Sequence, residues 1–483
     1  MPVQSLDMNL LPLLPEIFLS LAAMGLLLLG VGKDTPSGRC TVAWGSYASL
    51  ALALLLVLMG GSKAVTSFNG LFVQDGFAHF MKIGILLAAL LPLVISSDYV
   101  KEHKLDQPEY YVLTLFAALG GMVMASSGDF LTLYLGLELM SLSIYVLAAF
   151  QRDDTKSNEA GLKYFVLGSM ASGILLYGIS LLYGVSGTTT FNGLNAFLAG
   201  DVHHHTLMLH MGILFVIAGL AFKVAAAPFH MWAPDVYQGA PTSVTAFMAV
   251  MPKFAAFAAI YRVLLGAFGH QLTYWSPILQ VLAIASLAIG AFVAIAQTNI
   301  KRMLAYSSIG HVGFILIGLA AGNVMGYQGV LLYLAVYLVM NVGVFAIIFI
   351  LGKEGVGEEI DDYKGLAHKR PLMAFIMALF MFSMAGVPPL AGFIGKFYVF
   401  LAALNSGMMA VAIMGVLFSA VGAFYYLRIV KLMYFDEASR EFAMPLSLTN
   451  RLVLAGTCLL ILYWGIFPGD LMTWAGHSVA TFK

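Results

Sequence analysis

Length, composition and charge exclude an ordinary soluble protein. The chain has 483 residues, of which 61% are hydrophobic and only 10% charged, and its mean hydropathy is +0.91. Soluble domains are about half apolar and about one quarter charged. The composition therefore predicts a polytopic membrane protein in a lipid bilayer. Its formal net charge is zero and it has no basic tract, so no nucleic-acid partner is expected.

The two cysteines and the first residues narrow the class further. Cys40 and Cys458 lie far apart and outside any cluster motif, which predicts a chain without redox cofactors of its own. The first ten residues contain Asp7 and no lysine or arginine, whereas a signal peptide needs a positive start. The range 10–32 is therefore expected to be a retained first helix.

Apolar runs long enough to cross a bilayer predict an all-α protein with about fourteen transmembrane helices. Asp129 and Asn158 are expected to cap two of these helices, and Pro108 to open another. Two of the runs, 208–237 and 371–405, are expected to be broken at prolines, the first at Pro228 and the second at Pro388 and Pro389. The other twelve are 10–32, 40–61, 77–96, 109–127, 129–150, 158–183, 242–265, 275–297, 303–321, 326–352, 408–434 and 452–474.

The distribution of lysine and arginine predicts the orientation. Loops after odd-numbered helices hold fifteen of these residues, whereas the other loops and the termini hold only Lys63 and Lys483. By the positive-inside rule the odd loops face the cytoplasm, and both termini are periplasmic. The length and the well-formed outer loops favour a bacterial inner membrane over a mitochondrial one. Lys82 and Arg262, near helix ends, are expected to reach the interface by snorkelling.

The helix spacing predicts an internal repeat. The ranges 109–265 and 275–434 each contain five spans, and an odd number of spans forces the two blocks into opposite orientations. The break falls at Pro228, 119 residues into the first block, and at Pro388, 113 residues into the second. This is the pattern of an inverted-topology repeat with a broken helix in each half. A three-helix segment, 1–108, precedes the repeats and a C-terminal helix, 435–483, follows them.

A lysine accompanies each break. Lys223 precedes Pro228, and Lys396 follows Pro388 and Pro389. A lysine at the bilayer centre costs about 2.5 to 3.5 kcal/mol, so both should face protein or a hydrated cavity. Broken helices at membrane depth form ion sites in transporters. The alternative for the first break is that its lysine reaches an interface and the prolines only kink the helix.

Further ionisable residues fall at membrane depth. Counting along the helices places Glu138 and Lys253 near the bilayer centre and Lys163 nearer the cytoplasmic face. A carboxylate about 7 Å from a lysine changes its protonation free energy by about 2.4 kcal/mol. A movable Glu138 could therefore set when Lys223 holds its proton.

Two histidines in the predicted helices have two possible roles. His230 and His311 are either proton relays or ordinary buried histidines. The run 203–205, three histidines, is interpreted as a surface loop, and no metal site is predicted.

Five stretches together resemble a known family. They are LGLELMSL at 135–142, GLKYFVLGSMASG at 161–173, FKVAAAPFHMWAPDVYQGAP at 222–241, QTNIKRMLAYSSIGHVGF at 297–314 and AGVPPLAGFIGKFYVF at 385–400. The chain resembles the antiporter-like proton-pumping subunits of respiratory complex I over essentially its whole length. The resemblance implies proton-translocating roles for Glu138, Lys163, Lys223, Lys253 and Lys396, and relay positions for His230 and His311.

Within this family the chain is most similar to the chain N branch. The chain L type carries a long lateral helix after its fourteen spans, whereas this sequence stops at Lys483. The resemblance implies that a chain of the M type would have a glutamate as the proton carrier at the second break, whereas this sequence has Lys396 there. The resemblance implies neighbours of the chain K and chain M types, with FMN, iron–sulfur clusters and quinone in partner subunits.

Two other functions remain open at this stage. One is a large subunit of a multisubunit cation/proton antiporter, a class of protein that resembles this family through the same charged motifs. A purely structural membrane-arm subunit is the other, but a scaffold gains nothing from several buried lysines that each cost a few kcal/mol.

Overall fold

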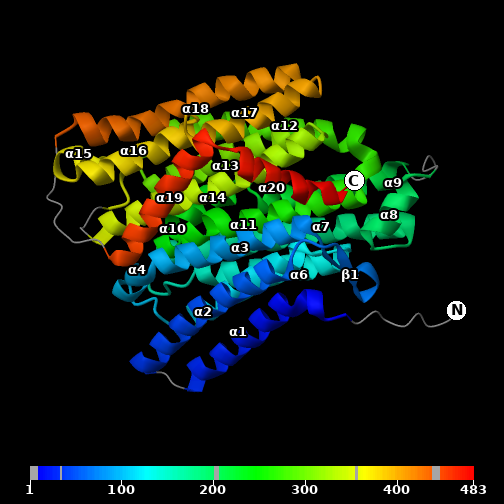
Figure 1. Ribbon diagram of the computed structural model, residues 1–483, viewed down its shortest axis with the longest axis horizontal. Helices are drawn as coiled ribbons and strands as arrows, with labels where there is room; N and C mark the ends of the chain where they lie inside the picture. The colour runs from blue at the N-terminus through cyan, green and yellow to red at the C-terminus, as the bar shows by residue number, and fades with distance from the viewer. Residues whose placement is uncertain (1–8, 33–34, 201–205, 354–356, 438–446, 483) are drawn as a thin grey trace.

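The computed structural model describes residues 9–32, 35–200, 206–353, 357–437 and 447–482, which are nearly all helical (Figure 1). The three histidines at 203–205 lie outside these residues, so their assignment to a surface loop stays a prediction. The described strands are β1 (Val65–Ser67) and β2 (Phe72–Gln74), which form an antiparallel hairpin.

Twelve helices in the described ranges are long and apolar enough to cross a membrane. Two broken helices complete the fourteen expected spans: α9 (Thr206–Lys223) with α10 (Trp232–Gly239), and α16 (Pro371–Ala385) with α17 (Ala391–Asn405). The all-α polytopic prediction is confirmed. The unbroken helices are α1 (Leu14–Gly32), α2 (Pro36–Gly60), α3 (Gly76–Ile95), α5 (Pro108–Ala125), α6 (Phe130–Ala148), α7 (Thr155–Ser186), α11 (Thr242–Tyr261), α12 (Leu272–Ile295), α13 (Ile300–Ala320), α14 (Val324–Lys353), α18 (Met409–Phe435) and α19 (Leu448–Ile466).

The helix starts follow the expected cap chemistry with one exception. Asp129 caps α6 by accepting a hydrogen bond from the Thr132 amide at 2.8 Å, and Pro108 is the first residue of α5. The cap of α7, however, is Asp154, which accepts from the Lys156 amide at 2.9 Å. Asn158 lies inside α7, so its prediction as a cap was wrong. A carboxylate caps as well as an amide, and Asp154 comes first along the chain.

The last expected span, 452–474, is shorter than predicted. Helix α19 ends at Ile466, and a separate helix, α20 (Gly469–Val479), starts after Pro468. Proline has no amide hydrogen and its ring clashes with the preceding turn, which disfavours continuation of the helix through Pro468. The prediction missed this helix end because the run was identified by its apolar composition alone.

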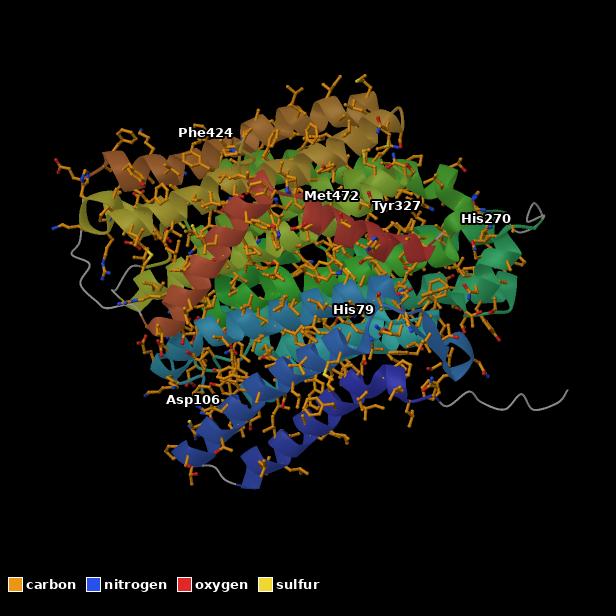
Figure 2. The ribbon with its side chains drawn as sticks, in the orientation of Figure 1. His79, Asp106, His270, Tyr327, Phe424 and Met472 are labelled. Carbon is orange, nitrogen blue, oxygen red and sulfur yellow. The ribbon has the colours of Figure 1, made fainter. Side chains whose placement is uncertain are left out.

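The helices lie roughly alongside one another, with α1 and α2 along one edge and α17 and α18 along the opposite edge (Figure 1). Every residue of α11 is buried, and α13 is nearly so. Outer helices expose apolar side chains, such as Phe424 of α18, which points away from the bundle (Figure 2). An apolar outer surface is what a multi-pass membrane protein presents to lipid.

Glycines allow the first two helices of each expected block to pack closely. A Cβ on Gly136 of α6 would meet the Gly120 carbonyl oxygen of α5 at 2.8 Å. A Cβ on Gly290 of α12 would meet the Gly310 amide nitrogen of α13 at 2.6 Å. Small residues at such contacts let membrane helices approach closely. The inverted repeat itself stays a prediction.

Side chains satisfy the backbone groups that the first break frees. The Ala227 amide donates to Ser286 Oγ at 2.9 Å, and Trp232 Nε1 donates to the Phe222 carbonyl at 3.1 Å. Pro228 lies in this break, whereas Pro234 lies in the first turn of α10, where a missing amide hydrogen costs nothing.

The second break is built similarly. Helix α16 ends at Ala385 and is capped by Gly386, whose φ of 90° suits glycine, and Pro388 and Pro389 follow. Ser383 Oγ accepts from the Gly392 amide at 3.1 Å. The predicted break positions are therefore confirmed.

Candidate functional site

Lys223 ends α9 directly before the first break and is buried. Its ammonium donates to three hydroxyls: Ser141 Oγ at 3.0 Å, Tyr145 OH at 3.1 Å and Ser172 Oγ at 3.2 Å. Within the described part of the chain it forms no ion pair with a carboxylate. A buried cation with hydroxyl partners faces the protein interior, so the alternative that Lys223 reaches an interface was wrong.

Glu138 lies on the same face of α6 as two of these hydroxyls. Ser141 and Tyr145 follow it at three and seven residues, which is one face of a helix. One of its carboxylate oxygens is buried and accepts no hydrogen bond from any described residue. Ser141 thus stands one helical turn from the carboxylate and in contact with the lysine. A direct pair between Glu138 and Lys223 is absent from this structure.

Lys253 lies in the middle of α11 and is 3% exposed. Its ammonium donates to Tyr337 OH at 3.2 Å, and this hydroxyl donates to the Ala249 carbonyl at 3.1 Å. The ammonium also lies 6.0 Å from the centre of the Tyr237 ring. No described carboxylate pairs with Lys253, so aromatic rings and one hydroxyl are what stabilise its charged form.

His311 of α13 continues this polar series. Its ring lies 5.3 Å from that of Tyr337, and its two nitrogens contact Tyr333 OH at 2.6 Å and Tyr426 OH at 3.1 Å. A cavity of about 20 Å³, lined by His311 and Lys396 among others, lies between α13 and α17. Such a volume has room for about one water.

Lys396 binds the end of the other half of its broken helix. Its ammonium donates to the carbonyls of Met384 at 3.0 Å and Ala385 at 2.8 Å, the last residues of α16, and to Ser419 Oγ at 3.0 Å. Carbonyls at a helix C-terminus carry partial negative charge, which favours a cation there. Lys396 is thus a third buried lysine without a carboxylate partner among the described residues.

Aromatic rings connect the surroundings of Lys223 and Lys253. Tyr145 packs on Tyr164 with ring centres 4.7 Å apart, and Tyr164 stacks on Trp232 at 4.3 Å. Trp232 contacts Tyr237 at 6.4 Å, and Tyr237 lies beside Lys253. The half-helix α10 therefore carries two rings between the buried lysines.

Two of the predicted site residues lie apart from this series. The Lys163 side chain is 42% exposed and forms ion pairs with Glu159 at 2.7 Å and Asp235 at 2.8 Å. It lines an open cleft of about 180 Å³. His230 is half-buried in the first break, and its Nδ1 has no hydrogen-bond partner among the described residues. The structure thus brings together Lys223, Glu138, Lys253, His311 and Lys396 but not these two.

The hydroxyl partners are not evident from the sequence. Buried tyrosines need a partner for their hydroxyls, and Tyr333 and Tyr337 lie four residues apart on one face of α14. That spacing is the signal that could have found them. Serines such as Ser141 offer none, because small hydroxyl residues are common in membrane helices.

Two buried ion pairs correct another expectation. Lys82 is 0% exposed and pairs with Glu16 at 2.6 Å, while Arg262 pairs with Asp75 at 2.7 Å. The prediction that Lys82 and Arg262 snorkel was wrong. Their partners come from the N-terminal segment, and neutralising carboxylates remove the need to reach water.

No group of three or more histidine, cysteine, aspartate or glutamate residues is placed to hold a metal ion in the ranges that the structure describes. Cys40 and Cys458 are free thiols.

The fold and the site define a class of multi-pass membrane protein with buried cations along two broken helices. A family described as "NADH:quinone oxidoreductase/Mrp antiporter, TM" matches residues 127–422. A Magnetococcus marinus protein is 57% identical over 480 residues, 99% of each chain, and one from Paramagnetospirillum magneticum is 53% identical over 471 residues, 96% of each. Both are named NADH-quinone oxidoreductase subunit N. The chain belongs to the NADH-quinone oxidoreductase subunit N family.

Solved structures agree with this assignment. A chain of respiratory complex I from Thermus thermophilus with bound aureothin is 32% identical, with a TM-score of 0.81 over 96% of this chain and 99% of that one. A chain of the Mrp complex from Dietzia sp. DQ12-45-1b has a TM-score of 0.87 at 22% identity, over 98% of each chain. The second likeness concerns the fold alone.

Proposed function

We propose that the chain moves protons across the membrane as a membrane-arm subunit of an NADH:quinone oxidoreductase. The observation that carries this proposal is the series of buried Lys223, Lys253 and Lys396, each bound by hydroxyls, carbonyls or rings and by no described carboxylate. A lysine without a fixed counter-charge can release its proton, because burial disfavours the charged form. We infer that the energy comes from redox chemistry in partner subunits, where FMN, iron–sulfur clusters and quinone are expected.

Glu138 controls the first lysine in this mechanism. A carboxylate that approaches a lysine stabilises the charged form, and one that withdraws favours proton release. The free oxygen of Glu138 is available for such a movement, and Ser141 already contacts Lys223 one turn away. Small displacements of α6 against α9 thus load or unload this lysine.

The second half of the route runs from Lys253 to Lys396. Tyr337 connects Lys253 with the His311 ring, and the small cavity connects His311 with Lys396. A tyrosine hydroxyl can donate one proton while accepting another, and a neutral histidine has one donor and one acceptor nitrogen. The geometry therefore supports stepwise transfer along hydroxyl and imidazole groups.

We also propose the membrane in which this chain lies and the subunits next to it. The loops rich in lysine and arginine favour an orientation with both termini periplasmic, and the length and the well-formed outer loops favour a bacterial inner membrane. Subunits of the chain K and chain M types are the neighbours expected in the membrane arm.

Replacement of Lys223 by alanine tests the function. We expect assembled complexes that carry Lys223→Ala to lose NADH-driven proton pumping and quinone reduction, since the first proton carrier is gone. Lys63→Ala, at an exposed lysine outside the helices, is the matched control. Unchanged pumping per assembled complex in the Lys223 variant would contradict the proposal.

The antiporter alternative is less supported, because it rests on a likeness of fold to an Mrp chain. It predicts that the chain alone restores growth in sodium to a strain without antiporters. We expect no such growth.

A further inference from the structure

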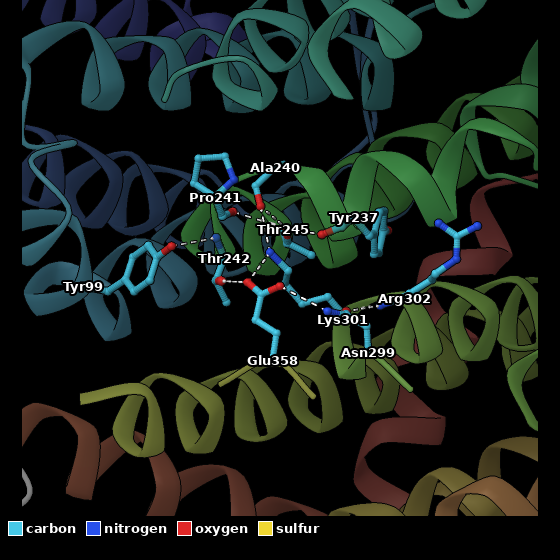
Figure 3. A network of polar contacts seen from close by, with 10 residues as sticks. All are labelled: Tyr99, Tyr237, Ala240, Pro241, Thr242, Thr245, Asn299, Lys301, Arg302 and Glu358. Atoms are coloured by element: carbon cyan, nitrogen blue, oxygen red, sulfur yellow. Dashed lines mark hydrogen bonds and ion pairs between the residues drawn. The ribbon is translucent and has the colours of Figure 1, made fainter. Parts of the chain in front are cut away.

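A polar network joins the segment between α14 and α16 to the starts of α11 and α13 (Figure 3). At its centre is Glu358, in the segment between α14 and α16. Its carboxylate lies 2.6 Å from Lys301 Nζ and accepts from Thr242 Oγ1 and Asn299 Nδ2, both at 3.2 Å. Two backbone hydrogen bonds anchor the segment to the start of α13, from the Ile300 amide to Glu358 and from the Ile360 amide to residue 298, each at 2.7 Å.

Lys301 connects this carboxylate to the first broken helix. Its side chain is 3% exposed, and its ammonium also donates to the Ala240 carbonyl at 3.0 Å. Ala240 directly follows the last residue of α10, where carbonyls carry partial negative charge. At the same C-terminal end of α10, Thr245 Oγ1 donates a hydrogen bond to the Tyr237 carbonyl at 2.9 Å. Glu358 thus acts on α10 through one buried ammonium.

A second contact of α13 with α10 also comes from the first turn of α13, in addition to the ion pair that Lys163 of α7 forms with α10. Arg302, the residue after Lys301, pairs with Asp235 of α10 at 2.6 Å. Helix α10 is therefore held at two points by neighbouring residues of the second expected block. Of these two cations only Lys301 is buried, and a buried cation that loses its partner is strongly destabilised.

The position of α10 decides what surrounds both central lysines. Tyr237 places its ring 6.0 Å from the Lys253 ammonium. Trp232 donates to the Phe222 carbonyl, one residue before Lys223. A shift of this half-helix would change both surroundings together.

We propose that Glu358 is a positioning residue for proton translocation, which acts through Lys301 to hold α10 against the buried lysines. The inference rests on the proposed function and adds a residue far from the membrane centre to it. Glu358 carries no proton in this scheme: its 42% exposed side chain supplies the fixed negative charge that keeps Lys301 on the Ala240 carbonyl.

A double-mutant cycle in the whole complex tests this. Glu358→Gln keeps the shape and removes the charge, and Lys301→Met removes the group through which it acts. We expect Glu358→Gln to lower the kcat of pumping per assembled complex by about threefold or more, and to have no further effect beside Lys301→Met, since coupled residues are non-additive. The KM values for NADH and quinone should not change, because α10 contacts neither substrate in this scheme.

Glu359→Gln is the matched control, since Glu359 is the adjacent, exposed carboxylate. Equal kcat in the Glu358 and Glu359 variants, or an equal loss on adding Glu358→Gln to Lys301→Met, would overturn the inference. The Lys223→Ala variant in the same series separates the two claims. If it stops pumping while Glu358→Gln does not, only the positioning role fails; if it pumps normally, the proposed function fails.

Discussion

At the scale of residues, the site consists of cations held by weak partners. Tyr337 is the clearest example, because its hydroxyl accepts from Lys253 and donates to the Ala249 carbonyl, while its ring lies 5.3 Å from the His311 ring. Removal of this hydroxyl leaves the ring packing against His311 in place and takes away the group that accepts from Lys253.

We therefore expect Tyr337→Phe to lower proton pumping by about tenfold, the effect of losing roughly one hydrogen bond of about 1.4 kcal/mol at the rate-limiting transfer. The measurement is the pumping rate per assembled complex. Tyr177→Phe, at an exposed tyrosine on α7, should leave the rate unchanged. Equal rates in the two variants would show that the Tyr337 hydroxyl is not on the route.

The buried ion pairs have a different role, because their charges are fixed by direct partners. Asp75 binds Arg262 through both oxygens, at 2.7 and 2.8 Å. Asp75→Ala should cost about 3–5 kcal/mol, because it leaves a buried guanidinium without its counter-charge. A fall in the thermal unfolding midpoint of the solubilised complex would show this loss. Glu102→Ala, at an exposed carboxylate, should leave the midpoint unchanged, and equal midpoints would refute a stabilising role for the pair.

At the scale of elements, close packing of α5 on α6 places Glu138 and Ser141. A side chain at Gly136 would press on the Gly120 carbonyl oxygen of α5, 2.8 Å away, and backbone cannot give way cheaply. Gly136→Ala should therefore destabilise the pair by about 1–3 kcal/mol and reduce the yield of assembled complex. Gly173→Ala has open space around it and is the control. Equal assembly of both variants would show that this contact is not limiting.

The sequence predicts the elements well where local chemistry decides them. Prolines locate both breaks, and Asp129 and Pro108 locate two helix starts. It fails where partners come from distant segments. Depth along a helix suggests that Lys82 snorkels, but Glu16 lies 66 residues earlier in the chain and meets it only in the folded bundle. The hydroxyls around Lys223, which is on α9, come from two other helices, α6 and α7, and are hidden for the same reason.

At the scale of the whole molecule, the buried cations extend across the bundle from Lys223 in the first expected block to Lys396 in the second. The network of Glu358 and Lys301 joins the two blocks at one face, outside this series. The network that holds α10 at this face therefore lies apart from the series of Lys223, Lys253 and Lys396.

The most direct test of the series is Lys253→Met. Since Lys253 has no described carboxylate partner, replacing it by an apolar side chain of similar length leaves no buried charge unpaired, and thermal stability should stay equal or rise. The same variant should stop proton pumping by the assembled complex, because the central carrier is missing. Pumping at the normal rate in a stable, assembled Lys253→Met complex would contradict the account.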